Sequence, residues 1–135
     1  MSGYLLDTNI VSDLIRNPSG DAARRLAQLE TQDIFTSIIV ASELHYGCAK
    51  KDSPKLLARV KALLEIIQVL PLEVPSDLVY GQIRAELESL GQPISANDML
   101  IAAHAQTLGL VLVTDNTQEF SRIPNLVLEN WLARS

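Results

Sequence analysis

The fold is decided by the stretch Gly3-Tyr4-Leu5-Leu6-Asp7-Thr8-Asn9-Ile10. In it, a short apolar run ends in a carboxylate that is followed by hydroxyl and amide side chains. The run predicts a buried strand with Asp7 at its carboxyl end. In an open α/β sheet, the carboxyl ends of the strands line the crevice where ligands bind. We therefore expect Asp7 to face a functional site.

The composition is that of one aliphatic domain. The 135 residues are 47% hydrophobic, 20% charged and 4% aromatic, which is typical of a globular chain and not of a disordered one. This length predicts a single domain over residues 1–135. No apolar run reaches the roughly 18 residues of a membrane helix, and no basic signal-peptide segment precedes the first strand. We expect a cytoplasmic protein without a membrane partner, and the single cysteine, Cys48, agrees because it cannot form an internal disulfide.

Strands alternate with helices along the rest of the chain. Further strands are predicted over 33–36, 69–72, 110–114 and 126–128. Helices are predicted over 13–15, 21–30, 38–50, 56–67, 77–90 and 99–108. This alternation predicts a small doubly wound α/β fold with a central parallel sheet. Thr8 and Asn9 are expected to cap the first helix, and Ser37 is expected to cap the helix over 38–50. The two helices between residues 54 and 90 are expected to form an arm.

Four acids stand at the edges of these apolar elements. Asp7 and Asp115 each follow a predicted strand, and Glu43 and Asp98 lie near the start of the two most apolar helices. In a parallel α/β unit, strand ends and the starts of the following helices meet at one edge of the sheet. The topology therefore predicts that the four acids converge.

Each acid also has a purely structural interpretation. Asp7 and Asp115 can cap helices or form turns, and Asp98 can favour the first turn of a helix. Glu43 is harder to explain in this way, because its predicted helical face, which it shares with Tyr46, is otherwise apolar. Acids on apolar faces are seldom buried unless they are paired or bind a ligand. The joint placement of the four acids favours a site.

The absence of counter-charges indicates a metal. No Lys or Arg lies within three positions of any of the four acids, so clustered carboxylates would repel one another and their pKa values would rise. All-oxygen ligands favour Mg²⁺ or Mn²⁺ over zinc, which prefers His and Cys. His45 is expected on a helix surface and His104 as a packed, hydrogen-bonded side chain. The net charge of −5 argues against nucleic acid, but an acid-lined site can bind phosphate through bridging cations.

At these residues the chain resembles the PIN-domain ribonucleases, and more closely the VapC toxins of bacterial toxin–antitoxin modules. The matching motifs are Leu5-Leu6-Asp7-Thr8-Asn9-Ile10, Ala41-Ser42-Glu43-Leu44, Ile94-Ser95-Ala96-Asn97-Asp98 and Leu112-Val113-Thr114-Asp115-Asn116-Thr117-Gln118-Glu119-Phe120. Each motif alone is weak, but four in the family's order make a specific match. The resemblance implies a PIN-like three-layer α/β/α sandwich around a small parallel sheet.

The resemblance also implies a metal-dependent endoribonuclease. In it, Asp7, Glu43 and Asp98 would hold Mg²⁺ or Mn²⁺ for the attack of a metal-activated water on a phosphodiester. The fourth position departs from the family pattern, because Asn116 stands where many PIN domains have an acid. Asp115, Asn116 and Glu119 remain alternatives for the fourth ligand, with Asp115 or Asn116 favoured. The residues expected to orient ligands or water are Thr8, Asn9, Thr114 and Glu119.

Partners follow from the resemblance as well. VapC toxins are held inactive by a VapB antitoxin, whose carboxyl-terminal segment lies over the toxin groove, and they usually form homodimers. Toxins of this type resemble enzymes that cut structured RNA, such as the anticodon loop of initiator tRNA. We expect operator DNA to be bound only through the antitoxin.

Two other functions remain open. A phosphatase with Asp7 as nucleophile would need an acid two residues later, where Asn9 stands, and a nearby Lys. A PIN-like module with weak or lost catalysis would only bind a partner or regulate DNA. The presence of Asp7, Glu43 and Asp98 together argues against lost catalysis.

Overall fold

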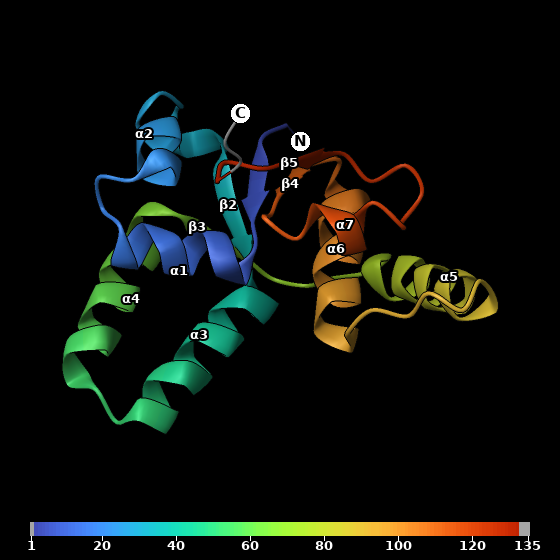
Figure 1. Ribbon diagram of the computed structural model, residues 1–135, viewed down its shortest axis with the longest axis horizontal. Coiled ribbons are helices and arrows are strands. Elements are labelled where there is room, and N and C mark those ends of the chain that lie inside the picture. The colour runs from blue at the N-terminus through green and yellow to red at the C-terminus, as the bar shows by residue number, and fades with distance from the viewer. Residues whose placement is uncertain (1, 133–135) are drawn as a thin grey trace.

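A computed structural model describes residues 2–132 of the chain (Figure 1). Its centre is a five-stranded sheet of order β3-β2-β1-β4-β5, in which every pairing is parallel. The strands are β1 (Tyr4–Leu6), β2 (Ile34–Ser37), β3 (Gln68–Leu70), β4 (Val111–Val113) and β5 (Leu128–Glu129). The strand order changes direction beside β1, which places the ligand crevice at the carboxyl ends of β1 and β4. The predicted parallel sheet is confirmed, although the last strand begins later than expected.

Helices lie on both sides of this sheet and complete the predicted three-layer α/β/α sandwich. They are α1 (Thr8–Arg16), α2 (Asp21–Ala27), α3 (Ile38–Lys51), α4 (Pro54–Ile66), α5 (Ser76–Ser89), α6 (Ala96–Leu108) and α7 (Thr117–Phe120). A 3₁₀ turn over Thr31–Asp33 precedes β2. Within residues 2–132, the helices are too short or too polar to cross a membrane. The predicted domain of residues 1–135 includes residues 1 and 133–135, which lie outside the described part of the chain.

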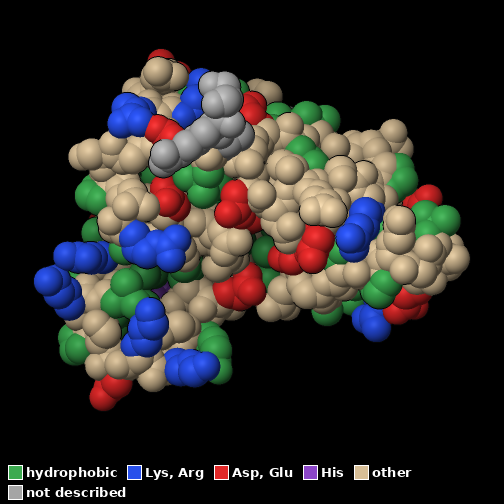
Figure 2. Space-filling view, viewed as in Figure 1, with side chains coloured by type: hydrophobic (Ala, Val, Ile, Leu, Met, Phe, Trp, Pro, Cys, Tyr) green, Lys and Arg blue, Asp and Glu red, His purple; other side chains and the backbone are tan. Residues whose placement is uncertain are grey.

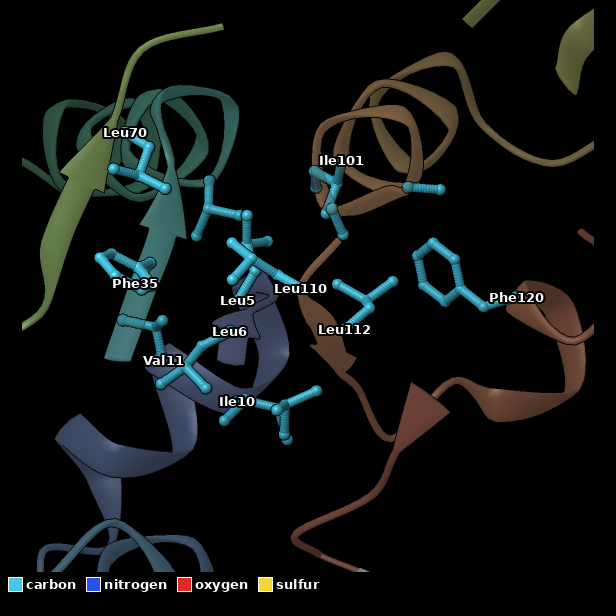
Figure 3. Packing of buried hydrophobic residues seen from close by; sticks show 14 of the residues in the cluster. Leu5, Leu6, Ile10, Val11, Phe35, Leu70, Ile101, Leu110, Leu112 and Phe120 are labelled. Atoms are coloured by element: carbon cyan, nitrogen blue, oxygen red, sulfur yellow. The ribbon is translucent and has the colours of Figure 1, made fainter. Parts of the chain in front are cut away.

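The core forms on the two faces of the central strands. Leu5 and Leu6 are fully buried because neighbouring side chains of a strand point to opposite faces and both faces are covered. Figure 3 shows Ile10 and Val11 of α1 on one side of the strands and Ile101 of α6 on the other. The buried strand ending at Asp7 is therefore held from both sides.

The first helix starts one residue earlier than its predicted cap. Asp7 has extended backbone angles and its carboxylate accepts a hydrogen bond from the backbone N–H of Ile10 at 3.0 Å, so Asp7 is the N-cap of α1. The prediction that Thr8 and Asn9 cap this helix is wrong, because both residues already lie within it. Ser37, as predicted, caps α3 by accepting from Ile39.

The predicted arm of two helices does not form. α4 packs against α3, and α5 packs against α6. Figure 1 shows the α3–α4 pair and the α5–α6 pair at opposite ends of the molecule. The reason is β3, which lies between α4 and α5 in the chain and takes the edge of the sheet beside β2.

Candidate functional site

Asp7 lies at the carboxyl end of the central strand. Its side chain is only 5% exposed, and its backbone N–H donates to the carbonyl of Val113 at 3.0 Å, which ties it to the end of β4. Burial raises the pKa of Asp7 to about 6, and the negative charges of Asp115 and Asp98 also raise it. Hydrogen bonds from Thr114 and Ile10 act in the opposite direction. Asp7 is thus a helix cap and also a member of a group of acids.

Asp98 lies in the first turn of α6, close to acids from two other helices. Its backbone N–H donates to the Ser95 hydroxyl at 3.2 Å, so Ser95 caps the helix. Burial raises the pKa of Asp98, a hydrogen bond with Ser95 lowers it, and the charges of Glu43 and Glu119 raise it. The negative charges of acids on α3 and α7 therefore both act on Asp98.

Glu43 is half-buried and is held by the neighbours of the other two acids. Its Oε1 accepts from the hydroxyl of Thr8 at 2.5 Å, and its Oε2 accepts from the side-chain amide of Asn97 at 3.5 Å. Thr8 follows Asp7, and Asn97 precedes Asp98. The carboxylate of Glu43 is therefore oriented from both sides. Asn97 was not among the predicted site residues, although its place beside Asp98 is a usable signal.

The apolar stripe predicted around Glu43 is not a buried face. Tyr46, on the same side of α3, is 67% exposed, whereas the buried residues of this helix are Val40, Ala41, Leu44 and Cys48. Glu43 therefore lies at the edge of the side of α3 that faces the core. Its hydrogen bonds to Thr8 and Asn97 account for its orientation.

The candidates for the fourth position differ in what they contact. Asp115 is exposed and accepts a hydrogen bond from the side-chain amide of Asn9 at 3.1 Å. The side-chain amide of Asn116 donates to Glu119 at 2.8 Å, and its backbone N–H donates to the hydroxyl of the buried Thr114 at 3.0 Å. The fold thus brings Asp115 and Glu119 to the same edge as the other acids, while the Asn116 amide is engaged by Glu119.

Within the described residues 2–132, no Lys or Arg forms an ion pair with this group of acids. The ion pairs formed within residues 2–132 join Arg24 to Asp21, Arg25 to Glu129 and Arg84 to Glu88. In the same part of the chain, no three His, Cys, Asp or Glu side chains already lie close enough together to hold an ion. The oxygen donors and the charge repulsion among them nevertheless fit a hard divalent cation, whose binding would draw the carboxylates inward.

The two histidines lie where the sequence predicts. His45 is exposed. His104 is buried on α6, and its Nδ1 lies 2.8 Å from the hydroxyl of Ser37, the cap of α3. Burial lowers the pKa of His104. This contact links the helix of Asp98 to the start of the helix of Glu43. Cys48 is a free thiol, as expected of a single cysteine, and it is buried.

Comparisons with known proteins agree with this arrangement. The PIN domain family matches residues 4–126. Ribonuclease VapC2 of Rickettsia felis is 38% identical over 95% of this chain and 97% of its own length. The tRNA(fMet)-specific endonuclease VapC of Salmonella typhimurium is also 38% identical, over 97% and 99%.

A solved structure shares the whole architecture. The crystal structure of VapBC2 from Rickettsia felis bound to a DNA fragment from their promoter matches with a TM-score of 0.89 and 37% identity, over 97% of this chain and 99% of that chain. Because sequence and fold agree over nearly the full length, the chain belongs to the PIN-domain family and, within it, to the VapC ribonucleases.

Proposed function

We propose that this protein is a Mg²⁺- or Mn²⁺-dependent endoribonuclease toxin with Asp7, Glu43 and Asp98 as its metal ligands. The observation that supports it most strongly is the convergence of acids at one edge of the sheet, where the charges of neighbouring acids add to the burial that raises the pKa values of Asp7 and Asp98. Hydrolysis of a phosphodiester would leave a 5′-phosphate and a 3′-hydroxyl.

The residues have distinct parts in this reaction. An ion held by Asp7, Glu43 and Asp98 would supply a water of lowered pKa for the attack and would compensate the charge that develops on the phosphate. Asp7, with a pKa of about 6, is mostly ionised at neutral pH and ready to act as a ligand. Thr8 and Asn97 hold the Glu43 carboxylate in place, as hydrogen-bond partners of ligands commonly do.

Asp115 is the fourth ligand in this proposal. Its charge acts on Asp7, and the hydrogen bond from Asn9 holds its carboxylate. The amide of Asn116 already donates to Glu119, so this proposal leaves Asn116 and Glu119 as a hydrogen-bonded pair outside the ligand set.

The names of the relatives support the partners. The Salmonella typhimurium relative is named a tRNA(fMet)-specific endonuclease, and we extend this to a structured RNA such as initiator tRNA in the cytoplasm. The VapBC2 structure supports a VapB-type antitoxin as inhibitor. The same proposal includes a homodimer of this chain and the binding of operator DNA through the antitoxin alone.

Cleavage of small RNA by the purified protein tests the proposal. We expect cleavage with Mg²⁺ or Mn²⁺, none with EDTA, and none by Asp7→Ala. The matched control is Asp77→Ala, since Asp77 is an exposed acid on α5, and this variant is expected to cleave like the wild type. Equal cleavage in EDTA, or by Asp7→Ala, would refute the metal-dependent mechanism.

A further inference from the structure

Two buried polar residues, Thr36 and Ser37, end β2, the strand beside β1. Both are fully buried, and because neighbouring side chains of a strand point to opposite faces, they lie on opposite sides of the sheet. Burial of a hydroxyl costs free energy unless the hydroxyl is hydrogen-bonded. The Thr36 hydroxyl donates to the carbonyl of Leu6 at 2.7 Å, directly before Asp7. The end of β2 is thus tied to the strand that carries Asp7.

Ser37 joins the helices of the other two proposed ligands. Its Oγ accepts from the backbone N–H of Ile39 at 3.1 Å and so caps α3, the helix of Glu43. The same Oγ lies 2.8 Å from Nδ1 of His104 on α6, the helix of Asp98. One buried hydroxyl therefore contacts both helices.

The imidazole of His104 is suited to hold this hydroxyl. It is only 1% exposed, and burial lowers its pKa, although the Pro71 carbonyl and the charge of Glu73 act in the opposite direction. The ring is therefore neutral at pH 7. A neutral imidazole and a hydroxyl can hydrogen-bond in either ring tautomer, because each of the two groups can donate or accept.

The buried contact lies close to the acids on both helices. Ser37 and Glu43, like Asp98 and His104, are about two turns or roughly 9 Å apart along their helices. Figure 2 shows acidic side chains gathered between the starts of α3 and α6, at the centre of this face. The other hydrogen bond between these helices, from Asn97 to Glu43, is exposed and 3.5 Å long. The shorter, buried bond is therefore the firmer link between α3 and α6.

We propose that Ser37 and His104 are a positioning pair, whose hydrogen bond fixes the separation of α3 and α6 so that Glu43 and Asp98 can hold the same ion. This inference rests on the proposed function, which makes both acids metal ligands. Mg²⁺ demands nearly ideal ligand geometry. A small shift of one helix against the other therefore weakens the binding of the ion.

Three substitutions of His104 separate its hydrogen bond from its packing. His104→Asn keeps a polar atom as many bonds from the backbone as Nδ1, His104→Gln places one at the distance of Nε2, and His104→Leu has none. Calorimetric titration of the purified full-length variants with Mn²⁺ measures the dissociation constant. We expect it to rise about tenfold for His104→Leu and His104→Gln, the lower end of the loss typical for hydrogen-bond partners of metal ligands. His104→Asn should restore most of the affinity.

The matched control is Ile83→Val, which shortens a buried side chain on α5, the helix that packs against α6. It is expected to lower Tm and to leave the Mn²⁺ affinity unchanged, since the contact between Ser37 and His104 is intact. RNA cleavage gives a second readout. The rate lost by His104→Leu at low Mn²⁺ concentration should return at saturating Mn²⁺, with KM for the RNA unchanged, because the defect is in metal affinity.

The outcomes distinguish the positioning pair from the proposed function. Wild-type Mn²⁺ affinity in His104→Leu, an equal loss in Ile83→Val, or no recovery in His104→Asn would overturn the pair alone. If His104→Leu does not fold, equal affinities of His104→Asn and His104→Gln would overturn it instead. Failure of the wild type to bind Mn²⁺ would refute the proposed function, and this inference with it.

Discussion

At two strand ends in this molecule an aspartate follows an apolar run, and only one of these two aspartates is buried. Asp7 follows β1 and is buried, because α1 begins at the next residue and the carboxylate accepts a hydrogen bond from the backbone N–H of Ile10. Asp115 follows β4 and is exposed, because Asn116 separates it from α7, a helix of only four residues. How closely a helix follows the strand thus decides whether the acid is buried or solvated.

The largest expected effect separates the two acids by activity. Asp7→Asn keeps an oxygen that can cap α1 but removes the charge, so we expect kcat/KM to fall about a thousandfold or more, which corresponds to several kcal/mol of lost charge stabilisation. Thermal unfolding shows whether the variant is folded. An equal loss for Asp115→Asn would contradict the distinction between the buried and the exposed acid.

The burial of Asp7 should make the unfolding free energy of the metal-free protein depend on pH. Its pKa is about 6 in the folded protein against an ordinary 3.8, so the folded state binds the proton more tightly than the unfolded chain. The resulting stabilisation is fully present below about pH 3.8 and is lost as the pH rises through about 6. We expect about 3 kcal/mol from this shift.

Urea unfolding in EDTA at pH 4 and pH 7 measures that contribution. The difference in unfolding free energy between the wild type and Asp7→Asn should change between the two pH values, with the wild type losing stability at pH 7. A difference of the same size at both pH values would show that Asp7 is not desolvated.

A smaller effect is expected from the residue that follows Asp7. Thr8 donates to Glu43 at 2.5 Å, and loss of a hydrogen-bond partner of a metal ligand typically costs 10–100-fold in metal affinity or activity. We expect Thr8→Val to weaken Mn²⁺ binding, measured by calorimetry, by about 10–100-fold, and Thr8→Ser to restore most of it. If Thr8→Ser is as impaired as Thr8→Val, the hydroxyl is not the cause.

The smallest effect is expected at the exposed strand end. Asn9 donates to Asp115 at 3.1 Å in an exposed position, where hydrogen bonds contribute little because water competes for both groups. We expect Asn9→Ala to lower kcat/KM by less than about tenfold. A loss as large as that of Thr8→Val would mean that Asp115 is held as firmly as Glu43.

The elements and the acids of the site follow from local sequence patterns. An apolar run followed by Asp predicts a strand end wherever it occurs, and Ser37 predicts the start of α3. Thr8 was predicted to orient a ligand, but its pairing and that of Asn97 with Glu43 could not be predicted, because they lie 35 and 54 residues away from it. The predicted arm of two helices was wrong for the same reason, since an apolar helix face indicates burial but does not identify the element that covers it.

The sequence by itself determined where the strands end, which acids follow them and which family the chain resembles. Backbone propensity and hydrophobic periodicity act over a few neighbouring residues, so they can be read directly. Only the tertiary structure decided that Asp7 is buried while Asp115 is exposed, and that Thr8 and Asn97 hold the carboxylate of Glu43. Burial and electrostatic fields depend on residues far apart in the chain, which only the folded packing brings together.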